Sequence, residues 1–170
     1  PFGKKPVNVL LGVMIATGIL SMFMSDTATT ALMIGMMTPV FASLGNDTNG
    51  KASLALSVTF AALIGGMGTP VGTPPAMLAY SAINDPEGLH MHLSFAKWMV
   101  IMIPLCFVLI FIAWRILIKI FPFTATEIEV HFENRASCRR DLIIVVATYA
   151  ITILLWVTEG ITGVKNSVAA

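Results

Sequence analysis

The first half of the chain alternates long apolar stretches with short polar interruptions. Residues 7–24 and 28–44 carry no charge, and only Ser25, Asp26 and Thr27 separate them. A transmembrane helix needs about 20 apolar residues, so each stretch is just long enough to span a bilayer. Because the connection lacks flanking charge and an aromatic belt, the pattern favours a re-entrant helical hairpin over two full spans joined by an external turn.

The next apolar stretch is interrupted at its centre. Residues 54–64 and 76–83 are each too short to span a bilayer, and GGMGTPVGTPP lies between them at residues 65–75. Proline removes an amide donor and glycine raises the entropic cost of a helix, so this segment predicts a broken helix. Thr73 and Pro74 are typical of an N-cap and a first helical position, which predicts where the helix restarts. Broken helices of this kind are typical of transporter binding sites.

Two further stretches predict complete spans. Residues 98–114 begin and end with tryptophan and lead to Arg115 and Lys119, and residues 142–157 are again apolar. We therefore expect an all-α polytopic membrane protein with five segments. These are a re-entrant hairpin with a polar tip (1–52), a broken transmembrane helix with a connector (53–92), a transmembrane helix (93–121), a cytoplasmic loop or surface helix (122–141), and a transmembrane helix with the start of the next segment (142–170).

The composition agrees with a membrane protein. Hydrophobic residues make up 56% of the chain and charged residues 11%, and the mean hydropathy is +0.86. The net charge is only +1 and the ten basic residues are scattered, which argues against a nucleic-acid partner. The glycine-rich segment lacks the Lys-Ser/Thr ending of a P-loop and follows no predicted strand, which argues against a nucleotide-binding enzyme. No motif predicts an organic cofactor.

Positive charge predicts the orientation of these segments. Lys4, Lys5 and Lys51 flank the hairpin on the side to which the chain returns at Arg115 and Lys119. Cytoplasmic loops carry an excess of Lys and Arg, so we expect this side to be cytoplasmic. The exceptions are Lys97 and Lys165.

The carboxylate of Asp26 is a candidate for a functional site. A charged side chain in a bilayer-length segment costs roughly 2.5–3.5 kcal/mol on insertion scales, so it usually faces a cavity, a partner or an ion. Ser21 lies one helical turn before Ser25 on the same face, and the two hydroxyls with the carboxylate offer the hard oxygen ligands that suit Na⁺. In the alternative, the serines donate to helix carbonyls and Asp26 is only an N-cap.

The two interruptions also offer groups for an anion. A helix that begins at the hairpin tip has free amide groups, which attract anions, while a helix that ends there has free carbonyls, which attract cations. Thr27 is close enough to the free amides to contact a substrate oxygen. In the broken helix, Gly72 and the other glycines expose carbonyls for an ion, and Thr73 exposes a hydroxyl at a helix N-terminus. In the alternative, the glycines serve only close packing.

Four segments resemble a known family. These are SDTATTALMIGMMTPV, IGGMGTPVGTPP, LSFAKWMVIMIPL and LLWVTEGITGVKNSVAA, which are similar to first-repeat segments of the divalent anion/sodium symporters, the dicarboxylate, citrate and sulfate carriers. The resemblance covers essentially the whole chain. It implies a hairpin that enters from the cytoplasm, an elevator-type transport domain, a homodimer, and a sodium site where the hairpin tip meets the broken helix. It also implies sodium ligands at Ser21, Ser25, Asp26 and Gly72, and substrate contacts at Asp26, Thr27 and Thr73.

The chain departs from that family in three respects. The family usually has Asn at the positions of Asp26 and Ala76. It also has two inverted repeats, each with a hairpin and a broken helix, whereas this chain has one of each, so we expect it to be an excerpt of a longer transporter. An ionised Asp26 would strengthen a cation site and repel a dicarboxylate, which favours a less charged substrate or proton coupling.

We therefore expect part of a secondary active transporter that symports sodium and a di- or tricarboxylate, or a similar anion. Its partners would be the anion, the lipid bilayer, the second repeat and a second copy, in a multi-pass protein of the plasma or inner membrane. One alternative is a proton-coupled or other-anion carrier of the same architecture, such as a citrate, sulfate or arsenite carrier. Another is a non-transporting subunit of a membrane assembly.

Overall fold

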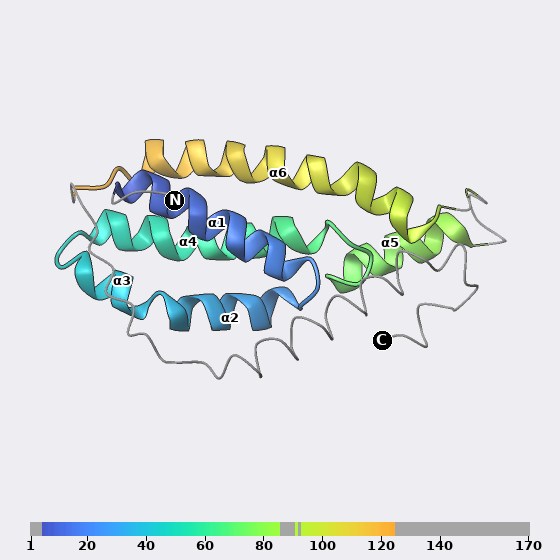
Figure 1. Ribbon diagram of the computed structural model, residues 1–170, viewed down its shortest axis with the longest axis horizontal. Helices are drawn as coiled ribbons and strands as arrows, with labels where there is room; N and C mark the ends of the chain where they lie inside the picture. The colour runs from blue at the N-terminus through green and yellow to red at the C-terminus, as the bar shows by residue number, and fades with distance from the viewer. Residues whose placement is uncertain (1–4, 86–90, 92, 125–170) are drawn as a thin grey trace, which may run out of the picture.

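Every regular element in the described part of the chain is an α-helix (Figure 1). The computed structural model describes residues 5–85, 91 and 93–124. The all-α prediction is confirmed for these residues, and the predicted span at residues 142–157 lies outside them, as does most of the predicted loop or surface helix at 122–141. The helices are α1 (Pro6–Ser21), α2 (Asp26–Met36), α3 (Thr38–Ser43), α4 (Thr48–Gly66), α5 (Pro74–Asn84) and α6 (Phe95–Ile120).

The polar triad forms the turn between α1 and α2. Helix α1 ends at Ser21, and Ser25 is the N-cap of α2, where its hydroxyl accepts a hydrogen bond from the Ala28 amide at 3.4 Å. The two helices contact each other along the hairpin. The chain therefore reverses at the predicted position.

The second half of the hairpin is divided, which the apolar pattern of residues 28–44 did not predict. Helix α2 ends at Met36 and α3 begins at Thr38. Pro39 has no amide hydrogen to donate to the carbonyl of Gly35. The hydroxyl of Thr38 donates to that carbonyl at 2.9 Å instead, so the helix is interrupted without leaving the carbonyl unpaired.

The broken helix restarts where the sequence predicts. Thr73 is the N-cap of α5, its hydroxyl accepts from the Ala76 amide at 3.3 Å, and Pro74 is the first helical residue. The first half, α4, is longer than the apolar residues 54–64 from which it was predicted. It begins at Thr48 because Asp47 caps it by accepting from the Gly50 amide at 2.9 Å.

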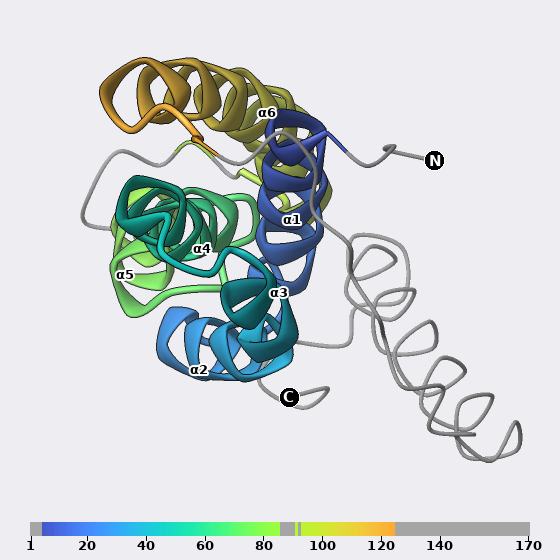
Figure 2. The ribbon, with the colours of Figure 1, turned by 90° about the vertical axis from the view of Figure 1, so that its left-hand side faces the viewer.

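Helix α4 lies at the centre of the bundle and contacts α1, α2 and α6 (Figure 2). Its side chains Leu54 and Val58 join a buried apolar cluster that also includes Leu10, Met14 and Ile110. Helix α6 has 26 residues and a mean hydropathy of 2.6 over its most apolar window. At 1.5 Å per residue it is about 39 Å long. Within the described residues, it is the one helix that is both long and apolar enough to cross a membrane.

Basic residues gather at one end of the bundle. The indole of Trp114 donates to the carbonyl of Val7 at 3.0 Å, and the amide of Thr124 donates to the carboxylate of Asp47 at 2.9 Å. These bonds bring the starts of α1 and α4 to the end of α6. The described basic residues at these helix ends are Lys5, Lys51, Arg115 and Lys119.

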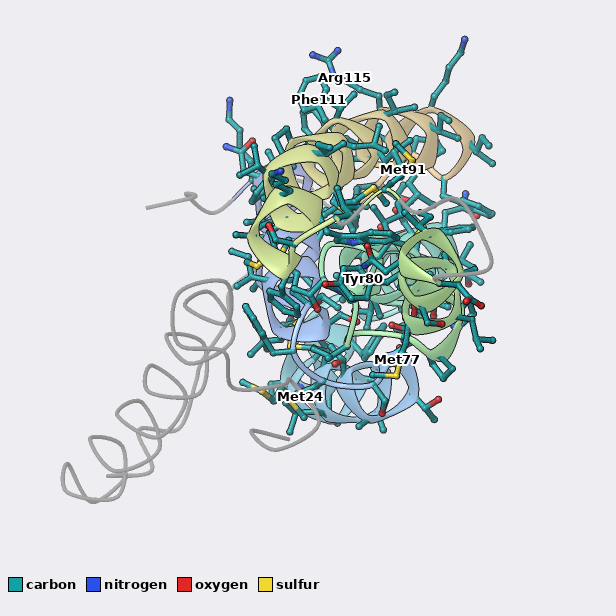
Figure 3. All side chains as sticks on the ribbon, turned by 90° about the vertical axis from the view of Figure 1, so that its right-hand side faces the viewer. Met24, Met77, Tyr80, Met91, Phe111 and Arg115 are labelled. Carbon is teal, nitrogen blue, oxygen red and sulfur yellow. The ribbon has the colours of Figure 1, made fainter. Side chains whose placement is uncertain are left out.

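Arg115 faces away from the bundle (Figure 3). Its guanidinium lies 5.0 Å from the ring centroid of Phe111 and 5.1 Å from that of Trp114. This stacking keeps a cation and two aromatic rings together near the end of a long apolar helix, as is typical of a membrane interface. Lys97, at the other end of α6, is the one described basic residue outside this group.

Helices α1 and α4 approach each other through glycine. A Cβ atom placed on Gly65 would lie 2.6 Å from the Cα atom of Gly18, and one on Gly18 would lie 2.7 Å from the Ile110 side chain. Small residues allow membrane helices to pack backbone against backbone. The position of α4, and hence of the break that follows it, depends on this contact.

We expect Gly65→Ala to destabilise the full-length protein by about 1–3 kcal/mol, because the new methyl group forces two backbones apart. The measurement is thermal or denaturant unfolding of the purified protein in detergent. Gly35→Ala is the matched control, since a Cβ at Gly35 meets nothing within 4 Å and alanine favours a helix by up to about 1 kcal/mol. Equal stability of the two variants would contradict close packing at Gly65.

Candidate functional site

The two interruptions of the helices lie against each other (Figure 1). The hydroxyl of Thr69, in the break between α4 and α5, donates a hydrogen bond to the carbonyl of Met22 at the end of α1. The hairpin tip and the break are 47 residues apart in sequence, so the fold alone brings them together. The ends of α1 and α4 and the beginnings of α2 and α5 therefore meet in one region.

Asp26 is joined to α1 across the tip of the hairpin. The Ser21 hydroxyl donates to Oδ1 of Asp26 at 3.0 Å. Ser21 is fully buried, whereas Asp26 is half-buried. The N-cap of α2 is Ser25 and not Asp26, and the Ser21 hydroxyl bonds to the carboxylate and not to a helix carbonyl. The geometry of Ser21 and Asp26 thus differs from the alternative in which they only complete helix ends, whereas Ser25 does cap α2.

The break supplies the other side of this region. A Cβ atom on Gly66 would overlap Oδ1 of Asp26 and the methyl group of Thr73, and one on Gly72 would overlap the carbonyl of Gly66. At Gly72 a side chain would collide with backbone, and at Gly66 it would displace the side chains of Asp26 and Thr73. The structure therefore places the carboxylate, the N-cap of α5 and the backbone of Gly72 around Gly66.

Two of the predicted residues lie at the edge of this region. The side chain of Ser25 is exposed and accepts the Ala28 amide, and Thr27 is exposed in the first turn of α2. Both belong to the same turn as Asp26. The structure therefore brings Ser21, Asp26, Gly72 and Thr73 into one contact region and leaves Ser25 and Thr27 beside it.

The charge of Asp26 has no basic partner in the described residues. Its side-chain hydrogen bond comes from a neutral hydroxyl, and no Lys or Arg of this part of the chain forms an ion pair with it. Most of the described basic side chains lie at the opposite end of the bundle. The helix termini add partial charges, negative where α1 and α4 end and positive where α2 and α5 begin.

Helix α6 supports the end of α4. The indole of Trp98 donates to the carbonyl of Met67 at 3.2 Å, and the thiol of Cys106 donates to the carbonyl of Ile64 at 3.0 Å. Tyr80 extends from α5 toward the bundle (Figure 3) and packs edge-on against Trp98, with ring centroids 5.9 Å apart. Two carbonyls at and just beyond the end of α4 are thus bonded to side chains of α6.

Thr69 was not among the residues predicted from the sequence. It is fully buried and links the break to the hairpin tip. The signal was a repeated tripeptide, Gly-Thr-Pro, at residues 68–70 and 72–74. Only the second copy precedes a helix, so capping rules identified Thr73 and gave no role to the first threonine.

The chain is similar to known transporters. It matches the family model described as citrate transporter over residues 2–170. It is 32% identical, over 92% of its length, to the sodium-dependent dicarboxylate transporter SdcS of Staphylococcus aureus strain USA300, and the same values hold for strains NCTC 8325 / PS 47 and COL. The chain spans about a third of the length of these relatives (33%).

The family and these relatives are transporters and not enzymes. Because the family model matches nearly every residue, the chain belongs to the citrate transporter family.

Proposed function

We propose that this chain forms one ion-binding and substrate-binding unit of a secondary transporter that symports a di- or tricarboxylate with sodium. The observation that carries the proposal is the contact region of Ser21 and Asp26 with Gly66, Gly72 and Thr73. The printed function of SdcS, a sodium-dependent dicarboxylate transporter, supports the choice of ion and substrate class.

The cation would bind between the hairpin tip and the break. Its ligands would be the hydroxyls of Ser21 and Ser25, the carboxylate of Asp26 and the backbone carbonyl of Gly72. Oxygen atoms of this kind suit a hard cation, and the end of α1 adds the negative end of a helix dipole. The observation that supports the fit is a half-buried carboxylate whose hydrogen-bond donor, among the residues the structure describes, is the neutral Ser21 hydroxyl.

The anion would bind beside the cation, at the beginnings of α2 and α5. First-turn amide groups and the positive ends of two helix dipoles attract a carboxylate, and Thr27 and Thr73 add hydroxyls. An anion about 4 Å from an ionised Asp26 would be repelled by roughly 4 kcal/mol at an effective dielectric constant of 20. A bound cation cancels this repulsion, so the two solutes bind better together than either alone.

The hairpin would be re-entrant, with its tip at membrane depth. Helix α6 is long enough to cross the bilayer, and its residues Trp98 and Cys106 hold the end of α4 against which the tip packs. The basic end of the bundle would face the cytoplasm. The unit would belong to the moving domain of an elevator-type, homodimeric plasma-membrane transporter whose second repeat completes the pocket, as the family resemblance implies.

We expect Asp26→Asn, made in the full-length protein, to raise the half-saturating Na⁺ concentration for uptake about 10-fold, because an amide oxygen lacks the charge of a carboxylate. A 10-fold change equals about 1.4 kcal/mol of binding free energy. The measurement is uptake of labelled succinate or citrate into proteoliposomes over ranges of Na⁺ concentration and pH. Asp85→Asn, at the exposed end of α5, is the control.

The same assay distinguishes a sodium-coupled carrier from the two alternative functions. Wild-type uptake driven by a pH gradient without Na⁺ would favour the proton-coupled carrier, to which the titratable carboxylate also points. Unchanged dependence on both Na⁺ and pH in Asp26→Asn would remove Asp26 from the coupling site. Absence of Na⁺-dependent binding of succinate and citrate by the wild-type protein would favour the membrane assembly subunit.

We expect Thr73→Val to raise the KM for the carboxylate more than the half-saturating Na⁺ concentration. The substitution removes a hydroxyl at the anion position, and it also removes the cap of α5, which costs about 1 kcal/mol of stability. Thr73→Ser keeps the hydroxyl and serves as the control. The measurement is initial uptake at saturating Na⁺ with varied substrate. Equal KM values for the two variants would assign Thr73 to helix capping alone.

A further inference from the structure

We propose that Thr69 is a positioning residue whose hydrogen bond to Met22 acts as a lock between the hairpin tip and the break. These two segments are the walls of the cation site, and the lock keeps their separation fixed. The residue itself would not bind the ion. The part of this inference that concerns Na⁺ rests on the proposed function above, whereas the part that concerns the lock rests on the hydrogen bonds alone.

The Thr69 hydroxyl is used twice. It donates its one hydrogen to the Met22 carbonyl and accepts the Gly72 amide at 3.1 Å. A hydroxyl has one hydrogen and two lone pairs, so both bonds form at the same time. The side chain is fully buried, which excludes water as a replacement partner on both sides.

Each partner of Thr69 is the neighbour of a predicted site residue. Met22 follows Ser21, whose hydroxyl holds Asp26, and Gly72 precedes Thr73, the N-cap of α5. A shift of the Met22 carbonyl therefore moves the first wall, and a shift of the Gly72 amide moves the second. Thr69 joins the two through a single oxygen atom.

The other hydrogen bonds of the break do not join it to the hairpin tip, which the break otherwise meets only by packing, as at Gly66 against Asp26. The Gly68 amide bonds to the Gly65 carbonyl at 2.8 Å, within the same segment, and Trp98 holds the Met67 carbonyl to α6. Neither bond reaches the hairpin. Across the described residues, the Thr69 bond to Met22 is the hydrogen bond that connects the break to the hairpin tip.

The test compares Thr69→Val, which keeps the shape and removes the hydroxyl, with Thr69→Ser, which restores it. The control is Thr17→Val, because Thr17 is also fully buried and donates to a carbonyl, that of Val13, within α1. In the full-length protein, Thr69→Val should raise the half-saturating Na⁺ concentration about 10-fold or more, because it removes two hydrogen bonds between buried groups and the loss of one is worth up to about 10-fold. Its maximal uptake at saturating Na⁺ should stay within about twofold of wild type, because added ion restores the loaded site.

Thr69→Ser and Thr17→Val should both keep the wild-type half-saturating concentration. A fall in maximal uptake with an unchanged Na⁺ dependence in Thr69→Val would overturn the proposal and leave Thr69 a purely structural role. If Thr69→Val does not fold, Thr69→Cys is used instead, since a thiol is a weaker donor. It should shift the Na⁺ dependence in the same direction by a smaller factor, and an unchanged value would also overturn the proposal.

Hydrogen exchange separates this inference from the proposed function. Without Na⁺, amide exchange should become faster in Thr69→Val at both residues 22–27 and residues 67–73, and should stay unchanged there in Thr17→Val. If wild-type uptake proves independent of Na⁺, the proposed function fails while exchange still decides on the lock. Faster exchange in only one of the two segments, or in neither, would overturn it.

Discussion

Every helix end leaves backbone amides or carbonyls without helical partners, and the region where the hairpin tip meets the break is organised around pairing these groups. Four helix ends meet where the hairpin tip contacts the break. Their unpaired carbonyls and amides find partners in side chains: Ser25 and Thr73 cap the beginnings of two helices, and Thr69 binds the carbonyl that ends α1. The groups proposed for ion and substrate binding lie in this same region and include the capping hydroxyls of Ser25 and Thr73.

The close approach of these ends depends on what lies next to them. Glycine at positions 18 and 65 lets α1 and α4 cross with their backbones in contact, and glycine at 66 and 72 makes room for the Asp26 carboxylate and for the folded break. Helix α6 then holds the end of α4 from the other side, through Trp98 and Cys106. Packing by small residues thus determines where polar atoms converge, although the glycines have no polar side chain of their own.

Local rules predicted the parts of this arrangement that depend on neighbouring residues. The three polar residues between two apolar stretches predicted the hairpin turn, and capping and proline chemistry predicted the restart of the broken helix at Thr73 and Pro74; both are observed. The interruption at residue 37 was missed although Pro39 signals it, because the apolar pattern continues through it. Thr69 was missed for a different reason. Its partner lies 47 residues away in sequence. Neither periodicity nor a local motif in a single sequence predicts which carbonyl a distant hydroxyl will bind.

The carboxylate of Asp26 explains why a lock between the two walls would matter for coupling. An amide at this position would be neutral with or without an ion, so an anion could approach in either case. Under the proposed function, a carboxylate would repel the anion until a cation arrives. This repulsion would weaken as the walls move apart, because the Coulomb energy varies inversely with separation. A tip and a break that moved independently would let the anion avoid the carboxylate and bind without the cation. A fixed separation is therefore the condition under which the charge of Asp26 would make the binding of one solute depend on the other.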